Sequence, residues 1–255
     1  ASGICHRWGY GYIETPIFEA TGLFSRGVGQ GTDIVEKEMY TFTDRGGSSL
    51  TLRPEGTAPV CRAYVEHGMA SLPQPVRLYY LAPAFRYERP QAGRMRQHHQ
   101  FGFEVIGDGS AMVDAEVITL AWRFFELLGL KDLKLILNSI GCAGCRPHYL
   151  EELKGYYAGH VSGLCPDCQK RMDKNPLRLL DCKEPSCQAV ADNAPKSTDR
   201  LCPQCREHFE TLTRSLELAD MEYAVSHRLV RGLDYYTRTV FEIQPLKAGS
   251  QSTIG

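Results

Sequence analysis

Eight cysteines arranged in pairs between residues 142 and 205 restrict what this chain can fold into. The chain contains ten cysteines among 255 residues, and these eight are spaced as Cys-x-x-Cys or Cys-x4-Cys. The four pairs are Cys142/Cys145, Cys165/Cys168, Cys182/Cys187 and Cys202/Cys205. Pairs of this kind are typical of structural zinc sites, in which four thiolates surround one ion. The sequence therefore predicts two structural Zn²⁺ ions.

The spacing alone does not decide how the four pairs combine, since three groupings into two sites are possible. Reduced cysteines without metal are the alternative interpretation. A stretch with few large apolar residues needs such cross-links, because its own core is too small to stabilise it. Cys5 and Cys61 lie outside the stretch, and we expect both to be small buried apolar residues.

The remaining composition is that of an ordinary globular protein, with 43% hydrophobic residues and a net charge of −1. No apolar run approaches the roughly 18 residues that cross a bilayer, and no signal peptide is recognisable at the start. Together with the reduced cysteines, this predicts a cytoplasmic protein without membrane contact. A local positive patch lies over 86–96, where four arginines stand beside one acid, Glu88.

The order of expected elements indicates an α+β fold with an antiparallel sheet flanked by helices. We expect the end of a helix over 4–10, a helix over 57–67 and a helix that Asp114 caps and Gly129 ends. Strands are expected over 11–16, 76–81, 84–88 with a turn at Pro83 before it, 100–106, 132–139, 223–225 and 235–243. Strand periodicity stops near Gly141 and returns after Asp220. The predicted organisation is a core over 1–140, a cysteine-rich insertion domain over 141–221, and the continued core over 222–255.

Two neighbouring strands are expected to form a hairpin with one polar and one aromatic face. In a strand, alternate residues share a face, so Gln100, Gly102 and Glu104 lie opposite Phe101, Phe103 and Val105. Arginine binds phosphate through a rigid fork of donors, and a central glycine lets a ligand approach the backbone. The hairpin therefore suits a nucleotide, although a solvated face with cross-strand ion pairs fits the spacing equally well.

The residues of the hairpin favour the first interpretation. The run from Phe85 to Glu104 closely resembles motif 2 of class II aminoacyl-tRNA synthetases in its histidyl form. The segments Thr51–Thr57 and Arg231–Tyr236 resemble two further signatures of that family, and Gly9–Glu19, with its proline, resembles the strand of motif 1. The resemblance covers the whole chain. It implies the class II synthetase fold interrupted by the cysteine-rich insertion.

The resemblance also implies roles for individual residues around ATP. Arg86 would contact the α-phosphate, Glu88 the adenine amino group and Arg94 the β/γ end of a bent triphosphate. Arg231 would meet the α-phosphate from the opposite side, so that Arg86 and Arg231 carry the catalysis. Alternatively, Arg231 is a surface residue of a glycine-containing turn.

A second set of residues would recognise L-histidine. Glu104 and Tyr236 would bind the imidazole ring, and Glu55, Gly56 and Thr57 the α-amino group. Gln100 lies beside them and Tyr235 completes the wall of the site. The resemblance thus predicts one cleft that contains Arg86, Glu104 and Arg231. As plainer alternatives, Glu55 caps a helix and the tyrosines belong to an ordinary core.

The reaction implied is ATP-dependent activation of L-histidine, assisted by Mg²⁺, and its transfer to tRNA(His) by a homodimer. Lys170, Arg171, Lys174 and Arg178 of the insertion could meet tRNA phosphates, or form a solvated basic surface. A synthetase-like regulatory subunit of ATP phosphoribosyltransferase, without catalysis, is the main alternative, and a zinc-ribbon nucleic-acid adaptor is a second. Because no motif 3 is recognisable, we expect the chain to be a fragment with weak or no activity and weakened dimerisation.

Overall fold

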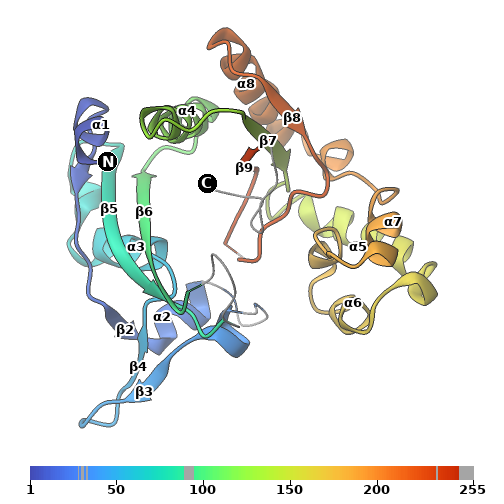
Figure 1. The fold of residues 1–255 in the computed structure, drawn as a ribbon, viewed down its shortest axis with the longest axis horizontal. Coiled ribbons are helices and arrows are strands. Elements are labelled where there is room, and N and C mark those ends of the chain that lie inside the picture. The colour runs from blue at the N-terminus through green and yellow to red at the C-terminus, as the bar shows by residue number, and fades with distance from the viewer. Residues whose placement is uncertain (28, 30–31, 33, 89–94, 234, 247–255) are drawn as a thin grey trace. The chain divides into compact units, whose positions relative to one another are not determined.

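The structure, a computed structural model, describes residues 1–27, 29, 32, 34–88, 95–233 and 235–246. The chain divides into two compact units, each described here by itself (Figure 1). Ala1–Gly129 and Leu233–Tyr235 form the first unit. Leu130–Gly232 and Tyr236–Gly255 form the second unit. The domain boundaries predicted at residues 140 and 221 differ from the limits of these two units, and they stay a prediction.

The first unit contains two small sheets and four α-helices among its described residues. Its helical segments are α1 (Ser2–Arg7), α2 (Thr21–Gly27), the π-helix η1 (Ile34–Glu38), α3 (Thr57–Glu66), the 3-10 helix η2 (Met69–Ser71) and α4 (Ala111–Leu127). Its strands are β1 (Gly11–Tyr12), β2 (Phe18–Ala20), β3 (Thr41–Thr43), β4 (Ser49–Leu52), β5 (Val76–Phe85) and β6 (Gln97–Ile106). One sheet has the order β1-β5-β6 and the other the order β2-β4-β3.

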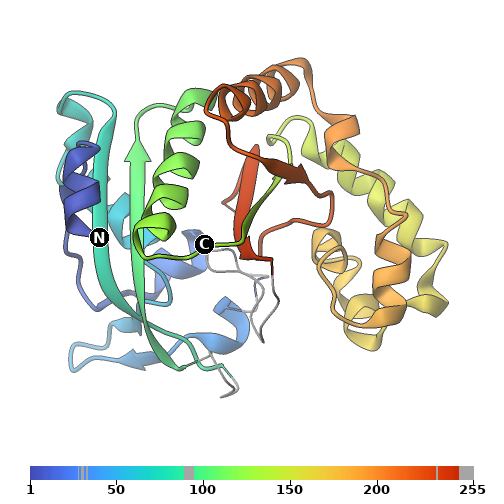
Figure 2. The same ribbon diagram turned by 45° about the horizontal axis from the view of Figure 1, so that its top comes forward.

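The predicted hairpin is confirmed as the long antiparallel pair β5–β6, which runs from Val76↔Ile106 to Phe85↔Gln97. One face of the pair is apolar: Phe101, Phe103 and Val105 pack with Tyr79 against residues of α1 and α4. Figure 2 shows α4 lying along this hairpin. The alternation of aromatic and polar residues therefore separates a core face from the face that carries Gln100, Gly102 and Glu104.

The turn predicted at Pro83 is wrong, because β5 is one strand through that residue. Proline lacks an N–H, so it fits a strand only where that position faces an unpaired edge. β1 pairs with β5 at Leu78 and Tyr79 only, and Pro83 lies beyond this stretch. Its carbonyl accepts a hydrogen bond from Arg53 Nε at 2.7 Å, which stabilises the strand at this point.

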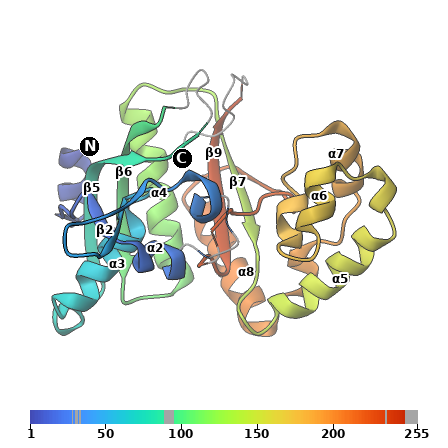
Figure 3. The same ribbon diagram turned by 90° about the horizontal axis from the view of Figure 1, so that it is seen from below.

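The second unit combines a three-stranded sheet of order β8-β7-β9 with the cysteine-rich segment. Its strands are β7 (Leu133–Ser139), β8 (Tyr223–Val225) and β9 (Thr239–Pro245). Its α-helices are α5 (Arg146–Ala158), α6 (Pro166–Arg171), α7 (Pro185–Ala191) and α8 (Pro203–Leu218). Its 3-10 helices are η3 (Val161–Gly163), η4 (Pro176–Leu179) and η5 (Ser197–Arg200). Figure 3 shows β7 and β9 side by side and α5, α6 and α7 gathered in one group.

The short helices of the cysteine-rich segment share one core with residues from both sides of the segment. Leu153, Tyr157, Leu179 and Leu180 are fully buried there, together with Cys168 and Cys187. Leu229 and Val230, which follow β8, belong to the same core. The segment is therefore not a detached ribbon, because its apolar residues pack on the chain that returns from it.

Three further expectations from the sequence are corrected. Helix α4 begins at Ala111, so Asp114 lies in its first turn and does not cap it. Strand β9 begins at Thr239 and not at Tyr235, because Arg238 has a φ of 57°, a left-handed conformation that interrupts an extended chain. Cys5 is buried as expected, but Cys61 is exposed on α3. Among the described helices, none has both the length and the apolar character required to cross a bilayer.

Candidate active site

Two carboxylates of the first unit lie close together where α3 begins beside the hairpin. Thr57 donates its hydroxyl to Glu104 Oε1 at 2.8 Å, and Tyr80 donates to the same oxygen at 3.3 Å. Glu55 accepts the backbone N–H groups of Thr57 and Ala58, both at 2.8 Å. We call Glu55, Thr57, Tyr80 and Glu104 the two-carboxylate site. Glu55 thus accepts the first N–H groups of α3, close to the plainer interpretation, although Gly56 is the N-cap residue and Glu104 lies next to Glu55.

The electrostatics of this site favour a cationic ligand. Burial and the neighbouring charge of Glu55 raise the pKa of Glu104 to about 7, although the hydroxyls of Thr57 and Tyr80 oppose the shift. Burial also raises the pKa of Glu55, against its hydrogen bonds from Ala58 and Thr57. Two acids that repel each other in a desolvated place are stabilised when a positive group binds between them or beside them.

Tyr80 occupies a position that only glycine neighbours allow. A Cβ atom on Gly56 would lie 2.3 Å from the Tyr80 ring, and one on Gly102 would also lie 2.3 Å from it. Tyr80 pairs directly with Gly102 across the hairpin. The two glycines therefore give the ring the room in which its hydroxyl reaches Glu104.

Arg86 extends the same face beyond the end of β5. Its backbone N–H donates to the carbonyl of Arg96 at 2.9 Å, and its Nε donates to the carbonyl of Pro54 at 2.8 Å. Arg86 thus lies next to Glu55, and its charge opposes the rise in the pKa of that carboxyl. The pKa of His98 is lowered by burial and by the charge of Arg86, whereas Glu88 raises it, so these three groups are neighbours.

The other predicted residues of this unit are placed as follows. Gln100 follows the same face of β6 as Gly102 and Glu104, two and four residues before them. Tyr235 belongs to the first unit and is exposed to 37%. Arg94 lies outside the described residues.

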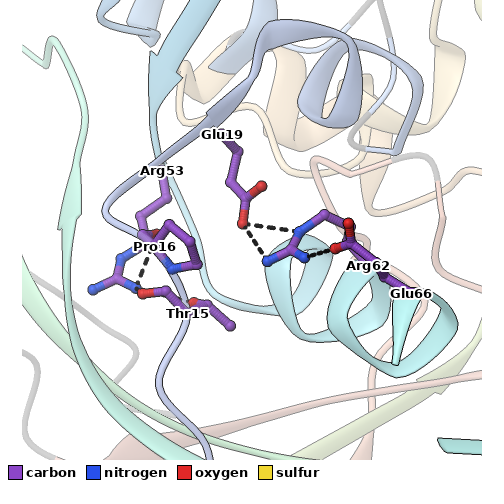
Figure 4. Close-up of polar contacts among 6 residues, drawn as sticks. All are labelled: Thr15, Pro16, Glu19, Arg53, Arg62 and Glu66. Carbon is purple, nitrogen blue, oxygen red and sulfur yellow. Dashed lines mark hydrogen bonds and ion pairs between the residues drawn. The ribbon is translucent and has the colours of Figure 1, made fainter. Parts of the chain in front are cut away.

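A buried arginine joins the strands that carry these groups. Arg53 is only 3% exposed, and its Nη1 donates to the carbonyl of Thr15 at 2.7 Å and to that of Pro16 at 3.3 Å. Figure 4 shows this arginine beside Thr15 and Pro16, and Arg62 of α3 between Glu19 and Glu66. Burial lowers the pKa of Arg53, and the nearby carboxylates of Glu14 and Glu19 oppose this shift. Arg53 and Arg62 therefore connect β2, α3 and β5 around the site.

Arg231 lies in the second unit, at a turn between β8 and β9. It donates Nη1 to Glu242 Oε1 at 2.7 Å and Nη2 to the carbonyl of Phe241, and its guanidinium lies 5.8 Å from the centre of the Tyr236 ring. Tyr236 packs against the core of the second unit, and Arg146 donates to its carbonyl. The prediction that Arg231 joins Arg86 and Glu104 in one cleft stays a prediction.

The eight paired cysteines form two clusters of four. Cys142, Cys145, Cys202 and Cys205 make the first, and Cys165, Cys168, Cys182 and Cys187 the second, with all four sulfurs of each within 4.8 Å of one another. Within them, Cys142 and Cys145 sulfurs are 3.8 Å apart, Cys142 and Cys202 4.0 Å, and Cys165 and Cys182 3.9 Å. A tetrahedron with Zn–S bonds of about 2.3 Å has edges of about 3.8 Å, so both clusters fit zinc.

Backbone donors around the sulfurs suit thiolates. The N–H of Cys165 donates to Cys187 Sγ at 3.1 Å, and that of Cys142 donates to Cys145 Sγ at 3.3 Å. Such hydrogen bonds favour the charged form that binds metal. Of the three groupings that the sequence allowed, the fold selects one.

Sequence reasoning missed Tyr80, Arg53 and Arg146. Tyr80 could have been found, because it stands six residues before Arg86 and an even separation in a strand places both on one face. Arg53 and Arg146 gave no such signal, since their partners are main-chain carbonyls that only the fold brings near.

Comparison with known proteins places this geometry in a family. The family model for Histidyl-tRNA synthetase matches residues 1–144. A histidine–tRNA ligase of Dehalococcoides mccartyi is 63% identical over 255 residues, which are 100% of this chain and 61% of that protein. This chain belongs to the histidyl-tRNA synthetase family. It spans about three fifths of the length of that relative.

Solved structures of histidyl-tRNA synthetases have the same fold. The apo enzyme of S. aureus superimposes with a TM-score of 0.72 at 39% identity, covering 95% of this chain and 55% of that one. A protein of Bacillus halodurans described as an ATP phosphoribosyltransferase regulatory subunit/histidyl-tRNA synthetase gives a TM-score of 0.66 at 25% identity, covering 97% of this chain and 67% of that one. The histidyl-tRNA synthetase fold predicted from the motifs is confirmed.

Proposed function

We propose that this protein activates L-histidine with ATP, giving histidyl-adenylate and pyrophosphate, and transfers the histidyl group to tRNA(His). The observation that carries the proposal is the two-carboxylate site, in which Glu55 and Glu104 lie within reach of Thr57. Histidine presents an α-ammonium group and an imidazole N–H, and each requires an acceptor. Glu55, Gly56 and Thr57 would bind the amine. Gln100 would lie beside these residues. Glu104 and Tyr236 would bind the imidazole, and Tyr235 would complete the wall of the site.

The chemistry requires positioning and charge neutralisation. The carboxylate of histidine is ionised at neutral pH, so it attacks the α-phosphate of ATP without a general base. The P–O bond to the pyrophosphate breaks as the new P–O bond to the carboxylate forms. Arg86 and Arg231 would neutralise the α-phosphate oxygens, Arg94 the β/γ end, and Glu88 would accept the adenine amino group. Mg²⁺ would accompany the triphosphate.

The two cysteine clusters would each bind one structural Zn²⁺ ion. The sulfur–sulfur distances of 3.8 to 4.0 Å and the backbone donors to sulfur support this assignment. Four buried or half-buried thiolates repel one another without a cation, so the metal contributes directly to folding. Metal analysis of protein purified without added zinc should give two equivalents per chain, and less than one equivalent would contradict the assignment.

The remaining partners follow from the family. The enzyme would act in the cytoplasm as a homodimer, and basic residues of the insertion, such as Lys170 and Lys174, would meet tRNA phosphates. A regulatory subunit of ATP phosphoribosyltransferase is less well supported, because the more similar proteins are named histidine–tRNA ligases. The presence of Gln100, Glu104 and Arg231 agrees with this preference.

Histidine-dependent exchange of pyrophosphate into ATP tests the function. Arg231→Ala should slow the exchange by about 10²–10³-fold, because one donor to the charge of the transition state is lost. Calorimetric affinity for histidine should stay within about twofold of the parent value, since Arg231 would not touch the amino acid. Binding of histidine without any exchange in a protein of the relatives' full length would favour a regulatory subunit instead.

A further inference from the structure

The segment that leads to Arg231 is attached through its side chains to residues near the second cysteine cluster. His227 Nε2 lies 3.0 Å from the carbonyl of Ala191, the last residue of α7. Arg228 donates Nε to the carbonyl of Leu180 at 3.2 Å and Nη1 to Asp192 Oδ1 at 2.8 Å. Leu180 lies two residues before Cys182, and Ala191 ends α7, the helix that carries Cys187. The attachment therefore depends on the part of the insertion that carries Cys182 and Cys187.

The next two residues are anchored by burial. Leu229 is 7% exposed and Val230 5%, and both pack in the core that contains Cys168 and Cys187. The carbonyl of Leu229 also accepts a hydrogen bond from Asn138 Nδ2 of β7 at 2.9 Å. The chain is thus fixed on two sides just before it reaches Arg231.

Directly after Arg231, the turn meets the insertion again. A Cβ atom on Gly232 would lie 3.3 Å from Arg178 Nη1, so the glycine lets the guanidinium approach the backbone. Arg178 pairs with Asp181 Oδ2 at 2.5 Å, and Asp181 is the residue before Cys182. The Arg178 guanidinium therefore lies beside the backbone of the Arg231 turn, which makes it a poorer candidate than Lys170, Arg171 and Lys174 to meet tRNA.

We infer that the Cys165–Cys168–Cys182–Cys187 cluster and Arg228 position the Arg231 turn. A metal bound there would hold in place the end of η4 and helix α7, beside which the carbonyls of Leu180 and Ala191 meet Arg228 and His227. These contacts fix the conformation of the segment between β8 and β9 that carries Arg231. Arg228 is a positioning residue, since it acts through Arg231. The catalytic part of this inference rests on the proposed function.

The first test is Arg228→Ala in the zinc-loaded protein. The variant should retain both zinc ions, and hydrogen exchange of the peptide covering 226–232 should accelerate about tenfold or more, because the amide of Leu229, bonded to Ser226, loses its support. The kcat of histidine-dependent exchange should fall about tenfold while the KM for histidine stays within twofold. Arg228→Lys keeps the charge near Asp192 and should restore part of both effects.

Arg200→Ala is the matched control. Arg200 also donates two hydrogen bonds to another part of the insertion, both to Glu152, at 2.6 and 2.9 Å, but neither bond involves residues 226–232. Its loss should change neither the exchange of that peptide nor kcat. Equal behaviour of the two alanine variants would overturn the positioning role of Arg228.

The second test separates the two metal clusters. Cys182→Ser should remove one equivalent of zinc and accelerate exchange in 226–232. Cys202→Ser should also remove one equivalent, but its largest acceleration should lie at the start of α8. If both serine variants loosen 226–232 equally, the second cluster has no special role. Hydrogen exchange needs no substrate, so failure of the proposed reaction would leave this part of the inference standing or falling on its own data.

Discussion

The two regions that carry the candidate active-site residues are built by different means. The two-carboxylate site lies on a ten-residue antiparallel strand pair and the start of a helix, and its geometry follows from backbone hydrogen bonds. The Arg231 turn lies between short strands, and its support comes from an insertion cross-linked by cysteines. The first is prepared by strand register, and the second would depend on the metal ions proposed for the two cysteine clusters.

The two regions of this protein are therefore preorganised in two different ways. Strand pairing fixes alternate side chains on one face without any cofactor. A turn of few residues has no such ladder, so it needs buried contacts from elsewhere to occupy one conformation. We therefore expect the two proposed steps, binding of histidine and formation of histidyl-adenylate, to respond differently to the same treatment.

Removal of zinc should separate the two regions most strongly. Each zinc ion bound by four cysteines would contribute on the order of 10 kcal/mol to folding, so a chelator should unfold the insertion. Hydrogen exchange should become fast over 146–232, whereas amides of β5 and β6 should remain protected. Loss of protection in both regions together would show that the first unit also depends on the metal.

Gly102→Ala should damage the strand-built region. The new Cβ would lie 2.3 Å from the Tyr80 ring, so the ring must move and its hydrogen bond to Glu104 is lost. We expect a decrease of about 1–3 kcal/mol in the free energy of unfolding, measured with urea, and weaker histidine binding. Gly109→Ala is the control, because a Cβ there meets nothing within 4 Å. A similar decrease in the free energy of unfolding of both variants would show that the close contact between Tyr80 and Gly102 is not the cause.

Glu104→Gln should abolish histidine binding and make the folded protein more stable than the parent as the pH rises. Because the pKa of Glu104 is raised to about 7 in the folded protein, its ionisation opposes folding, and stability falls as pH rises from about 4.5 to 7. Glutamine does not ionise, so the free energy of unfolding of the variant relative to the parent should increase by about 1–2 kcal/mol between pH 5 and pH 8, measured with urea. Histidine binding should be lost at both values.

Glu116→Gln serves as the control of opposite sign. Hydrogen bonds from Arg77 lower the pKa of Glu116, so its charged form stabilises the fold above its ordinary pKa. The glutamine variant should therefore be less stable than the parent at pH 8, by about 1 kcal/mol or less for a half-exposed pair. If both glutamine variants shift stability in one direction, the electrostatic account of the site is wrong.

Cys61→Ser should have the smallest effect. Cys61 is exposed, and partial desolvation together with Glu104 and Glu55 raises the pKa of its thiol to about 11. Serine should change the unfolding free energy by less than about 0.5 kcal/mol and leave the zinc content unchanged. A loss of zinc in this variant would mean that the two regions share their cysteines.

Much of the strand-built region could be predicted from local pattern. Strict alternation gave the two faces of β6, and the motif resemblance gave the family. The break expected at Pro83 was wrong. Proline lacks the N–H that a central strand needs, but β5 is not paired with β1 at this residue, so the missing N–H does not interrupt the strand. The start of β9 was wrong because the left-handed conformation of Arg238 leaves no periodic signal.

The metal-built region was less accessible to sequence reasoning. The spacing identified the eight ligands but not their grouping, because Cys142 meets Cys202 only through the intervening fold. The hydrogen bonds from Arg228 and Arg146 to main-chain carbonyls could not be predicted for the same reason. Every residue has a carbonyl, so the sequence does not indicate which one accepts the bond. Contacts between side chains and distant main chain are the part that pattern cannot supply.

The first cysteine cluster also has a consequence for how the second unit assembles. Strands β7 and β9 pair at Ser139↔Thr239, so their contact closes a loop of about 100 residues. Once a metal joins Cys142 to Cys202, the path between these strands shortens to about 40 residues, which lowers the entropic cost of closure by about 0.8 kcal/mol. An ion at the base of the insertion thereby turns a distant pairing into a nearer one, and the sheet should form faster in its presence.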